Sequence, residues 1–169
     1  NRFELRDESL TKFEYRNRQE YTELIRTIYS YGQGQANNQE IVIGNIMRQT
    51  LEAFSTFEFK KGIDKISTDD DILSLLGCAE YKVYFKNLMY RLVLHGGSHK
   101  EEQVKSMKDL NFFALISERE KKRTAKDILC FIYLLNKAHL LSHLKDIDSD
   151  AETKLNSWCQ DIQRRSAII

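Results

Sequence analysis

Two clusters of polar residues have the types and spacing that phosphate chemistry needs. The first comprises Asn45, Arg48 and Glu52, whose i, i+3, i+7 spacing would place all three on one face of a helix. A carboxylate four residues from an arginine can orient the guanidinium, which then binds phosphate oxygens through two hydrogen bonds. The alternative is an exposed ion pair between Arg48 and Glu52, which would stabilise the helix by only about 0.3–0.5 kcal/mol.

The second cluster surrounds two consecutive glycines. Arg91 and His95 lie one helical turn apart, and His99 follows Gly96 and Gly97, which end the predicted helix. A histidine near the start of a helix is well placed to transfer a proton beside a bound anion. The alternative is a helix cap followed by an exposed histidine. Because no Asp, Glu or Cys stands at a ligand spacing from these histidines, we expect no metal site here.

Two other features have both a structural and a functional interpretation. His139 and His143 share a helix face, and we expect them to be packing histidines, with a zinc site formed by all four histidines as the alternative.

The charged run over 119–126 is typical of the solvated start of a helix. The alternative is a strip of side chains that contacts RNA.

The elements that position these residues are predicted to be helices. The 169 residues include no proline, where about eight would be usual, and proline is excluded chiefly from helix interiors. Apolar residues recur at helical spacing, for example from Ile43 through Met47 and Phe54 to Phe57. We therefore predict an all-α fold, a compact bundle of about seven helices. The predicted helices cover 7–31, 38–59, a short segment that Thr68 caps and Gly77 ends, 79–95, a segment ending near 116, 119–144 and 151–165.

Composition limits the class of protein. Apolar residues make up 41% and charged residues 30%, which is typical of a globular chain, and the formal net charge is only +1. The longest apolar stretches are a few residues long, far short of the roughly 20 that a membrane span needs. Three widely spaced cysteines without a C-x-x-C motif indicate reduced thiols. We expect one cytoplasmic domain over 1–169 that does not contact a membrane.

Four sequence blocks occur in an order that resembles a known family. They cover residues 20–25, 44–57, 90–99 and 125–132, and they include the Asn45, Arg48 and Glu52 pattern and the Ser98-His99 pair. They resemble the C-terminal region of the RloC/PrrC-like AAA-family ATPases, in which an ABC-type nucleotide-binding part precedes a helical domain of the HEPN class. The resemblance extends over roughly residues 20 to 144. It implies that this chain is the C-terminal part of a larger ATPase.

The resemblance also implies a function, because characterised members of that family are anticodon nucleases of phage defence. It implies a metal-independent endoribonuclease module controlled by a fused ATPase, with Arg48, Glu52 and His99 as catalytic residues and Asn45, Arg91 and His95 binding the substrate. The implied partners are RNA, with tRNA as the expected substrate, the ATPase part of the same protein and a second copy of the chain. ATP and Mg²⁺ belong to the ATPase part, because this chain lacks the Gly-Lys-Ser/Thr of a P-loop and needs no cofactor of its own.

A non-catalytic role fits the same sequence. In that alternative the chain is a helical regulatory or dimerisation module of an AAA/ABC-type ATPase. The two hypotheses differ in whether Arg48, Glu52 and His99 converge on one cleft or are dispersed over the surface.

Overall fold

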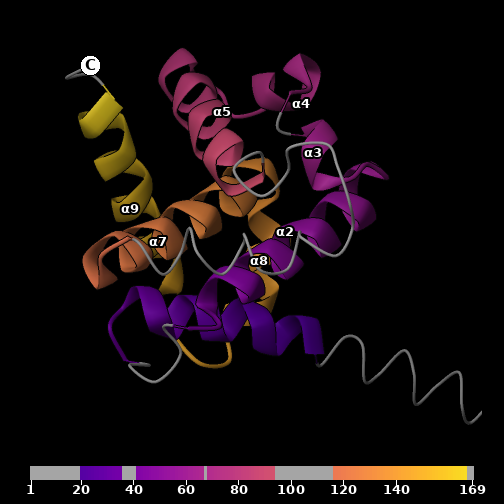
Figure 1. Ribbon diagram of the computed structural model, residues 1–169. Helices are drawn as coiled ribbons and strands as arrows, with labels where there is room; N and C mark the ends of the chain where they lie inside the picture. Colours follow the sequence, from indigo (N-terminus) through magenta and orange to yellow (C-terminus); the bar gives the residue numbers. More distant parts are fainter. Residues whose placement is uncertain (1–19, 36–40, 67, 94–115, 167–169) are drawn as a thin grey trace, which may run out of the picture.

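The computed structural model describes residues 20–35, 41–66, 68–93 and 116–166, and these segments form a bundle of helices (Figure 1). Eight helices lie within them: a first segment over 20–32, α2 (Ile43–Phe59), α3 (Ile63–Ile66), α4 (Asp70–Ser74), α5 (Ala79–Val93), α7 (Glu118–Leu135), α8 (Lys137–Leu144) and α9 (Ala151–Ser166). These segments contain no strand. The predicted all-α bundle is confirmed, with eight helices where the sequence predicted about seven.

α7 is the central helix of the bundle. It packs against α2, α8 and α9, and Figure 1 shows it crossing the middle of the molecule beneath α5. Much of its second half is buried, with no exposed surface at Ala125, Ile128, Leu129, Cys130, Phe131 and Ile132. A helix that is apolar on most sides is typical of an element surrounded by others. The Phe131 ring meets Phe85 of α5 with their centroids 5.2 Å apart, so α5 is joined to the same core.

The structure divides the predicted helix over 119–144 into α7 and α8. Asn136 interrupts it with φ −150° and ψ 86°, and its side chain accepts a hydrogen bond from the backbone N–H of His139. An asparagine that bonds a neighbouring backbone group offers the chain an alternative to the helix, so the break has a local cause. α7 begins one residue earlier than predicted, after Ser117, which forms a capping box with Glu120.

The connector predicted over 60–67 contains the short helix α3, and Lys60 ends α2 in the left-handed region at φ 54°. Asp69, not the predicted Thr68, caps α4 by accepting from two backbone N–H groups. Phe57 was predicted to face the core with Met47 and is instead 77% exposed. Phe59 takes the place beside Phe54, with the two rings edge to face at 6.0 Å.

Other predicted bounds are close to the observed ones, and some fall outside the described residues. α5 and α9 begin at the predicted residues, and Gly77 lies just before α5 with φ +88°, a conformation that favours glycine. The predicted helix start at 7 and the helix ending near 116 fall largely in segments that the structure does not describe. Over the described residues, no helix is both long enough and apolar enough to cross a membrane.

The contact between α5 and α7 gives the first prediction. Phe85→Ala removes a fully buried ring and leaves a cavity against Phe131, so the free energy of unfolding should fall by about 3–5 kcal/mol. The matched control on the same helix is Val83→Ala, because Val83 is 61% exposed and should cost less than about 0.5 kcal/mol. Urea unfolding followed by circular dichroism measures both. Equal losses in the two variants would contradict this packing.

Candidate functional site

The structure places the first predicted cluster on α2. Asn45 and Glu52 are exposed and Arg48 is half-buried. The Glu52 carboxylate accepts a hydrogen bond from the backbone N–H of Ile63 at 3.2 Å, so it supports the start of α3. A carboxylate at that position is favoured because the first N–H groups of a helix lack partners within the helix.

The second predicted cluster lies mostly outside the described residues. Arg91 belongs to α5, but the structure describes only its place in the helix and not its side chain. His95 and His99 fall in the undescribed segment 94–115. The convergence of His99 with Arg48 and Glu52 therefore stays a prediction.

His139 and His143 are packing histidines, as the sequence predicted. Their rings stack edge to face at 5.0 Å, and each ring makes a hydrogen bond to the helix over 20–32: His139 with the Tyr21 hydroxyl at 3.0 Å, and His143 with the Thr22 hydroxyl at 2.9 Å. Burial lowers the pKa of His143 to about 4, and neighbouring His139 and Arg26 act in the same direction. Burial also lowers the pKa of His139, although the charge of Glu58 opposes it. The neutral imidazoles thus join α8 to the first helix.

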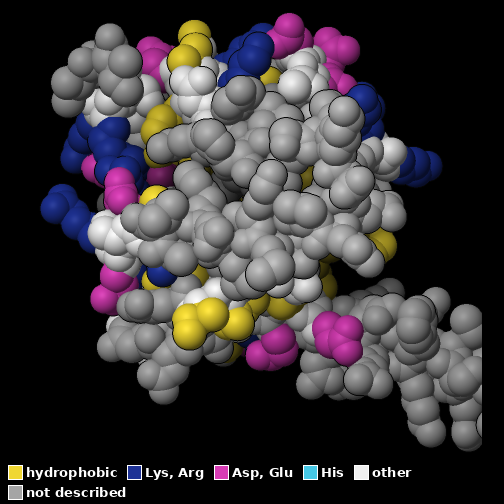
Figure 2. Space-filling model, in the orientation of Figure 1, with side chains coloured by type: hydrophobic (Ala, Val, Ile, Leu, Met, Phe, Trp, Pro, Cys, Tyr) yellow, Lys and Arg dark blue, Asp and Glu magenta, His cyan; other side chains and the backbone are white. Residues whose placement is uncertain are grey.

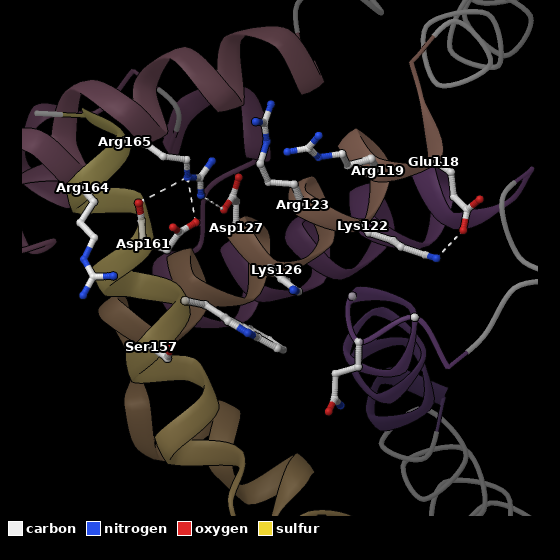
Figure 3. A pocket seen from close by; sticks show the side chains of 14 residues that line it. Glu118, Arg119, Lys122, Arg123, Lys126, Asp127, Ser157, Asp161, Arg164 and Arg165 are labelled. Carbon is white, nitrogen blue, oxygen red and sulfur yellow. Dashed lines mark hydrogen bonds and ion pairs between the residues drawn. The ribbon is translucent and has the colours of Figure 1, made fainter. Parts of the chain in front are cut away.

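A basic cleft lies where α7, α9 and the turn after the first helix meet. Its volume is about 890 Å³, and its walls include residues of α7, residues of α9 and the 32–34 turn (Figure 3). Six cations line it: Arg119, Lys122, Arg123, Lys126, Arg164 and Arg165. Only three carboxylates do so: Glu118, Asp127 and Asp161. Positive charge is therefore in excess, and Figure 2 shows basic side chains gathered at the edge formed by α7 and α9.

The three carboxylates neutralise two of the six cations. Lys122 forms an ion pair with Glu118, one helical turn earlier. Arg165 donates to Asp127 at 2.8 Å and forms an ion pair with Asp161 at 3.0 Å. Figure 3 shows both sets of contacts as dashed lines. These two cations are held by carboxylates and contribute little net charge to the cleft.

Asp127 is the buried centre of a network that joins three helices. The residue is 2% exposed, and its carboxylate accepts hydrogen bonds from Arg165 of α9 and, at 2.5 Å, from the Tyr84 hydroxyl of α5. Arg165 also donates to the Tyr84 hydroxyl at 3.0 Å. Burial raises the pKa of Tyr84 to about 12, as do the charge and the hydrogen bond of Asp127. Burial works to lower the pKa of Arg165, but the contacts with Asp127 raise it above its usual value.

Four cations of the cleft make no ion pair within the described part of the chain: Arg119, Arg123, Lys126 and Arg164. The first three follow i, i+4, i+7 spacing, and Figure 3 shows Arg119 and Arg123 extending from the same side of α7. The Lys126 ammonium instead lies over the ring of Trp158, 5.3 Å from its centroid. Guanidinium and ammonium groups without carboxylate partners can bind phosphate oxygens directly.

The sequence indicated the cations that α7 contributes to this cleft, but not the residues that α9 contributes. The charged run over 119–126 was assigned chiefly to a solvated helix start, with an RNA-contacting strip as the alternative, and in the structure four of its cations line a cleft. The contributions of Arg164 and Trp158 were missed, because only tertiary packing brings α9 beside α7. The local signal was the Arg164-Arg165 pair at the end of a predicted helix, which is also a common favourable pattern for the helix dipole.

The described residues include no group of three or more His, Cys, Asp or Glu side chains that could hold a metal ion. The three cysteines have free thiols, and Cys130 and Cys159 are buried between α7 and α9. The described lining of the cleft therefore consists of cations, three carboxylates, an aromatic ring and other hydrogen-bonding groups.

No family model, no curated protein and no solved structure matches the chain at a significant level. The class of protein therefore rests on the fold and the site: an all-α domain with a basic cleft.

The histidine pair gives a prediction about pH. Unfolded histidines take up protons near pH 6.5, whereas folded His143 does so only near pH 4. Since the unfolded state binds more protons in this interval, stability should be full above pH 6.5 and fall as the pH drops toward 4. We expect a loss of about 1–2 kcal/mol, allowing for the partial exposure of the ring. Urea unfolding at a series of pH values measures it.

The control for this prediction is His143→Gln, which can keep a hydrogen bond to Thr22 but does not titrate. Its free energy of unfolding should vary less with pH between 6.5 and 4.5 than that of the wild type. Wild type and variant with the same slope would show that another group causes the dependence.

Proposed function

We propose that this chain is an RNA-binding helical module whose basic cleft binds the phosphate backbone. The observation that carries the proposal is the set of four cations without carboxylate partners, which come from two helices and line one cleft. Side chains that would repel one another are gathered there without internal neutralisation, an arrangement that a bound polyanion would stabilise. A net charge of only +1 is compatible with this role, because the excess charge is local.

The four cations suit a backbone more than a single anion. Arg119 and Lys126 are seven residues apart on α7, which is about 10 Å along the helix axis. Arg164 adds a charge from α9 to the lining of the same cleft. Cations spread over such a length can contact successive phosphates of one strand, and release of counterions from those phosphates supplies the affinity.

The family resemblance adds chemistry to this proposal. We propose that the module is a metal-independent endoribonuclease, with tRNA as its substrate and a fused ATPase as its regulator. The ribose 2′-hydroxyl would lose its proton and attack the adjacent phosphate, and the bond from phosphorus to the 5′-oxygen of the next nucleotide would break, leaving a 2′,3′-cyclic phosphate and a 5′-hydroxyl. His99 would act in this proton transfer as general base or acid, and Arg48 would stabilise the charge on the pentavalent phosphorus. Glu52 would orient Arg48. Asn45, Arg91 and His95 would bind the substrate, and a second copy of the chain is a further proposed partner.

One observation favours the non-catalytic alternative. Glu52 accepts the backbone N–H of Ile63 and so has a structural partner that explains its presence without catalysis. In that alternative the chain is a regulatory or dimerisation module of an AAA/ABC-type ATPase, and Arg48 has no chemical role. The basic cleft is present in both cases, but only the nuclease proposal requires cleavage of RNA.

Salt dependence tests the binding proposal. Replacing both Arg119 and Arg123 by Ala removes two phosphate contacts, so the slope of log Kobs against log salt should become shallower by about 1.4 for single-stranded RNA. Lys86→Ala is the matched control, since Lys86 is an exposed helical cation that does not line the cleft. Fluorescence anisotropy of labelled RNA measures both. An unchanged slope in the double variant would mean that RNA binds elsewhere or not at all.

Cleavage is tested separately. Incubation with tRNA in excess chelator should leave 2′,3′-cyclic phosphate ends, because the 2′-hydroxyl is the nucleophile and no metal is needed. His99→Ala should lower the rate by about 10²- to 10⁴-fold, and Arg48→Ala by a comparable factor. His139→Gln is the control histidine and should cleave normally if it remains folded. Cleavage that ignores both substitutions would rule out these catalytic roles, while retained RNA binding without cleavage would support the non-catalytic alternative.

A further inference from the structure

The cleft contains the single tryptophan of the chain. Trp158 lies on α9, is half-buried and lines the cleft beside the cations of α7. Tyr29 of the first helix packs against its ring with centroids 5.5 Å apart and a tilt of 47°. The indole N–H makes no hydrogen bond to any residue that the structure describes, and it is not buried. The ring is therefore held by the fold and retains a donor for a ligand.

The contact between Lys126 and Trp158 is of a kind that a ligand can replace. The ammonium lies 5.3 Å from the ring centroid and has no carboxylate partner among the described residues. A cation over a partly exposed ring is a weak contact. If a planar base took the place of the ammonium on the ring, the flexible lysine side chain would become free to bind the adjoining phosphate.

Two glycines at the end of the first helix, Gly32 and Gly34, leave space in the cleft beside Lys126 and Lys122. A Cβ on Gly32 would lie only 3.2 Å from Cγ of Lys126, so a larger residue there would press on the lysine stem. Gly34 adopts φ +79°, a conformation that favours glycine, and lies on the Lys122 side of the cleft. The backbone of the turn can therefore approach α7 closely without filling the space in front of Lys126.

The shape of the cleft suits one or a few nucleotides. A volume of about 890 Å³ falls within the usual range of about 300–1,000 Å³ for sites that take small organic groups. Proteins contact a duplex with a convex element that enters a groove, or across many base pairs. A concave site with an aromatic wall and a basic wall instead fits an unpaired base together with its phosphates.

We propose that the cleft binds an unpaired nucleotide of an RNA strand, with the base stacked on Trp158 and the flanking phosphates on Arg119, Arg123 and Lys126. This inference rests on the proposed RNA binding and narrows it to single-stranded segments. Trp158 is then a specificity-determining residue, because it distinguishes a strand with free bases from any other polyanion.

Two ligands separate base stacking from charge. The first is a single-stranded RNA of eight nucleotides, and the second is inorganic polyphosphate with a similar number of charges and no bases. Because Trp158 is the only tryptophan, its fluorescence reports directly on the cleft of the 169-residue chain. Single-stranded RNA should quench it, while the same RNA annealed to its complement should quench it less at equal phosphate concentration.

Substitution of the ring completes the test, with affinity measured by anisotropy of labelled RNA and by its displacement with polyphosphate. Trp158→Leu keeps an apolar side chain against Tyr29 but cannot stack, so affinity for single-stranded RNA should fall by about 5- to 150-fold. Affinity for polyphosphate should change less than about twofold, because the phosphate contacts remain. Trp158→Phe keeps a smaller ring and should give an intermediate loss for RNA. If Trp158→Leu does not fold, the Phe variant and the comparison of single strand with duplex still decide the question.

The outcomes distinguish this inference from the proposed function. Salt-dependent RNA binding that is equal for single strand and duplex, or a Trp158→Leu variant that loses RNA and polyphosphate by the same factor, would overturn base stacking and leave RNA binding in place. If the wild-type chain bound neither ligand at low salt, the proposed function would fail with it.

Discussion

The buried carboxylate of Asp127 is the constraint on which the arrangement of α5, α7 and α9 depends. A charge that is only 2% exposed is costly unless it is paired and hydrogen-bonded. Arg165 of α9 and Tyr84 of α5 supply those contacts. Both helices are therefore positioned by hydrogen bonds to the two carboxylate oxygens of Asp127 on α7. The apolar core around Phe131 supplies most of the packing, but apolar contacts do not fix the direction in which α9 presents its polar side chains.

This constraint also separates the cations of the cleft into two groups. Arg165 is used to compensate Asp127 and Asp161, and Lys122 is paired with Glu118. Arg164, next to Arg165 in sequence, extends from the same helix without a carboxylate partner in the described structure, as do Arg119 and Arg123 from α7. The ion pairs thus leave a second set of cations without carboxylate partners within the described structure, and Arg119, Arg123 and Arg164 among them are exposed.

The sequence predicted the elements better than it predicted the site. Helical periodicity and the absence of proline were enough for the all-α class and for the starts of α5 and α9, because these depend on local pattern. The break at Asn136 was missed because its cause is a side-chain hydrogen bond within a strongly helical pattern. Nothing in the sequence distinguishes Arg164 from Arg165, since their roles depend on which one meets a carboxylate from a helix about forty residues earlier. The grouping of Arg48, Glu52 and His99 depends on residues 94–115, so that part of the predicted site stays a prediction.

The most direct test of this account compares the two neighbouring arginines by urea unfolding at neutral pH. Arg165→Ala leaves the Asp127 carboxylate buried without its charge partner, so the free energy of unfolding should fall by about 3 kcal/mol. Arg164→Ala removes an exposed side chain and should cost less than about 0.5 kcal/mol. Equal losses, or a larger loss for Arg164→Ala, would contradict the claim that Asp127 fixes α9 against α7.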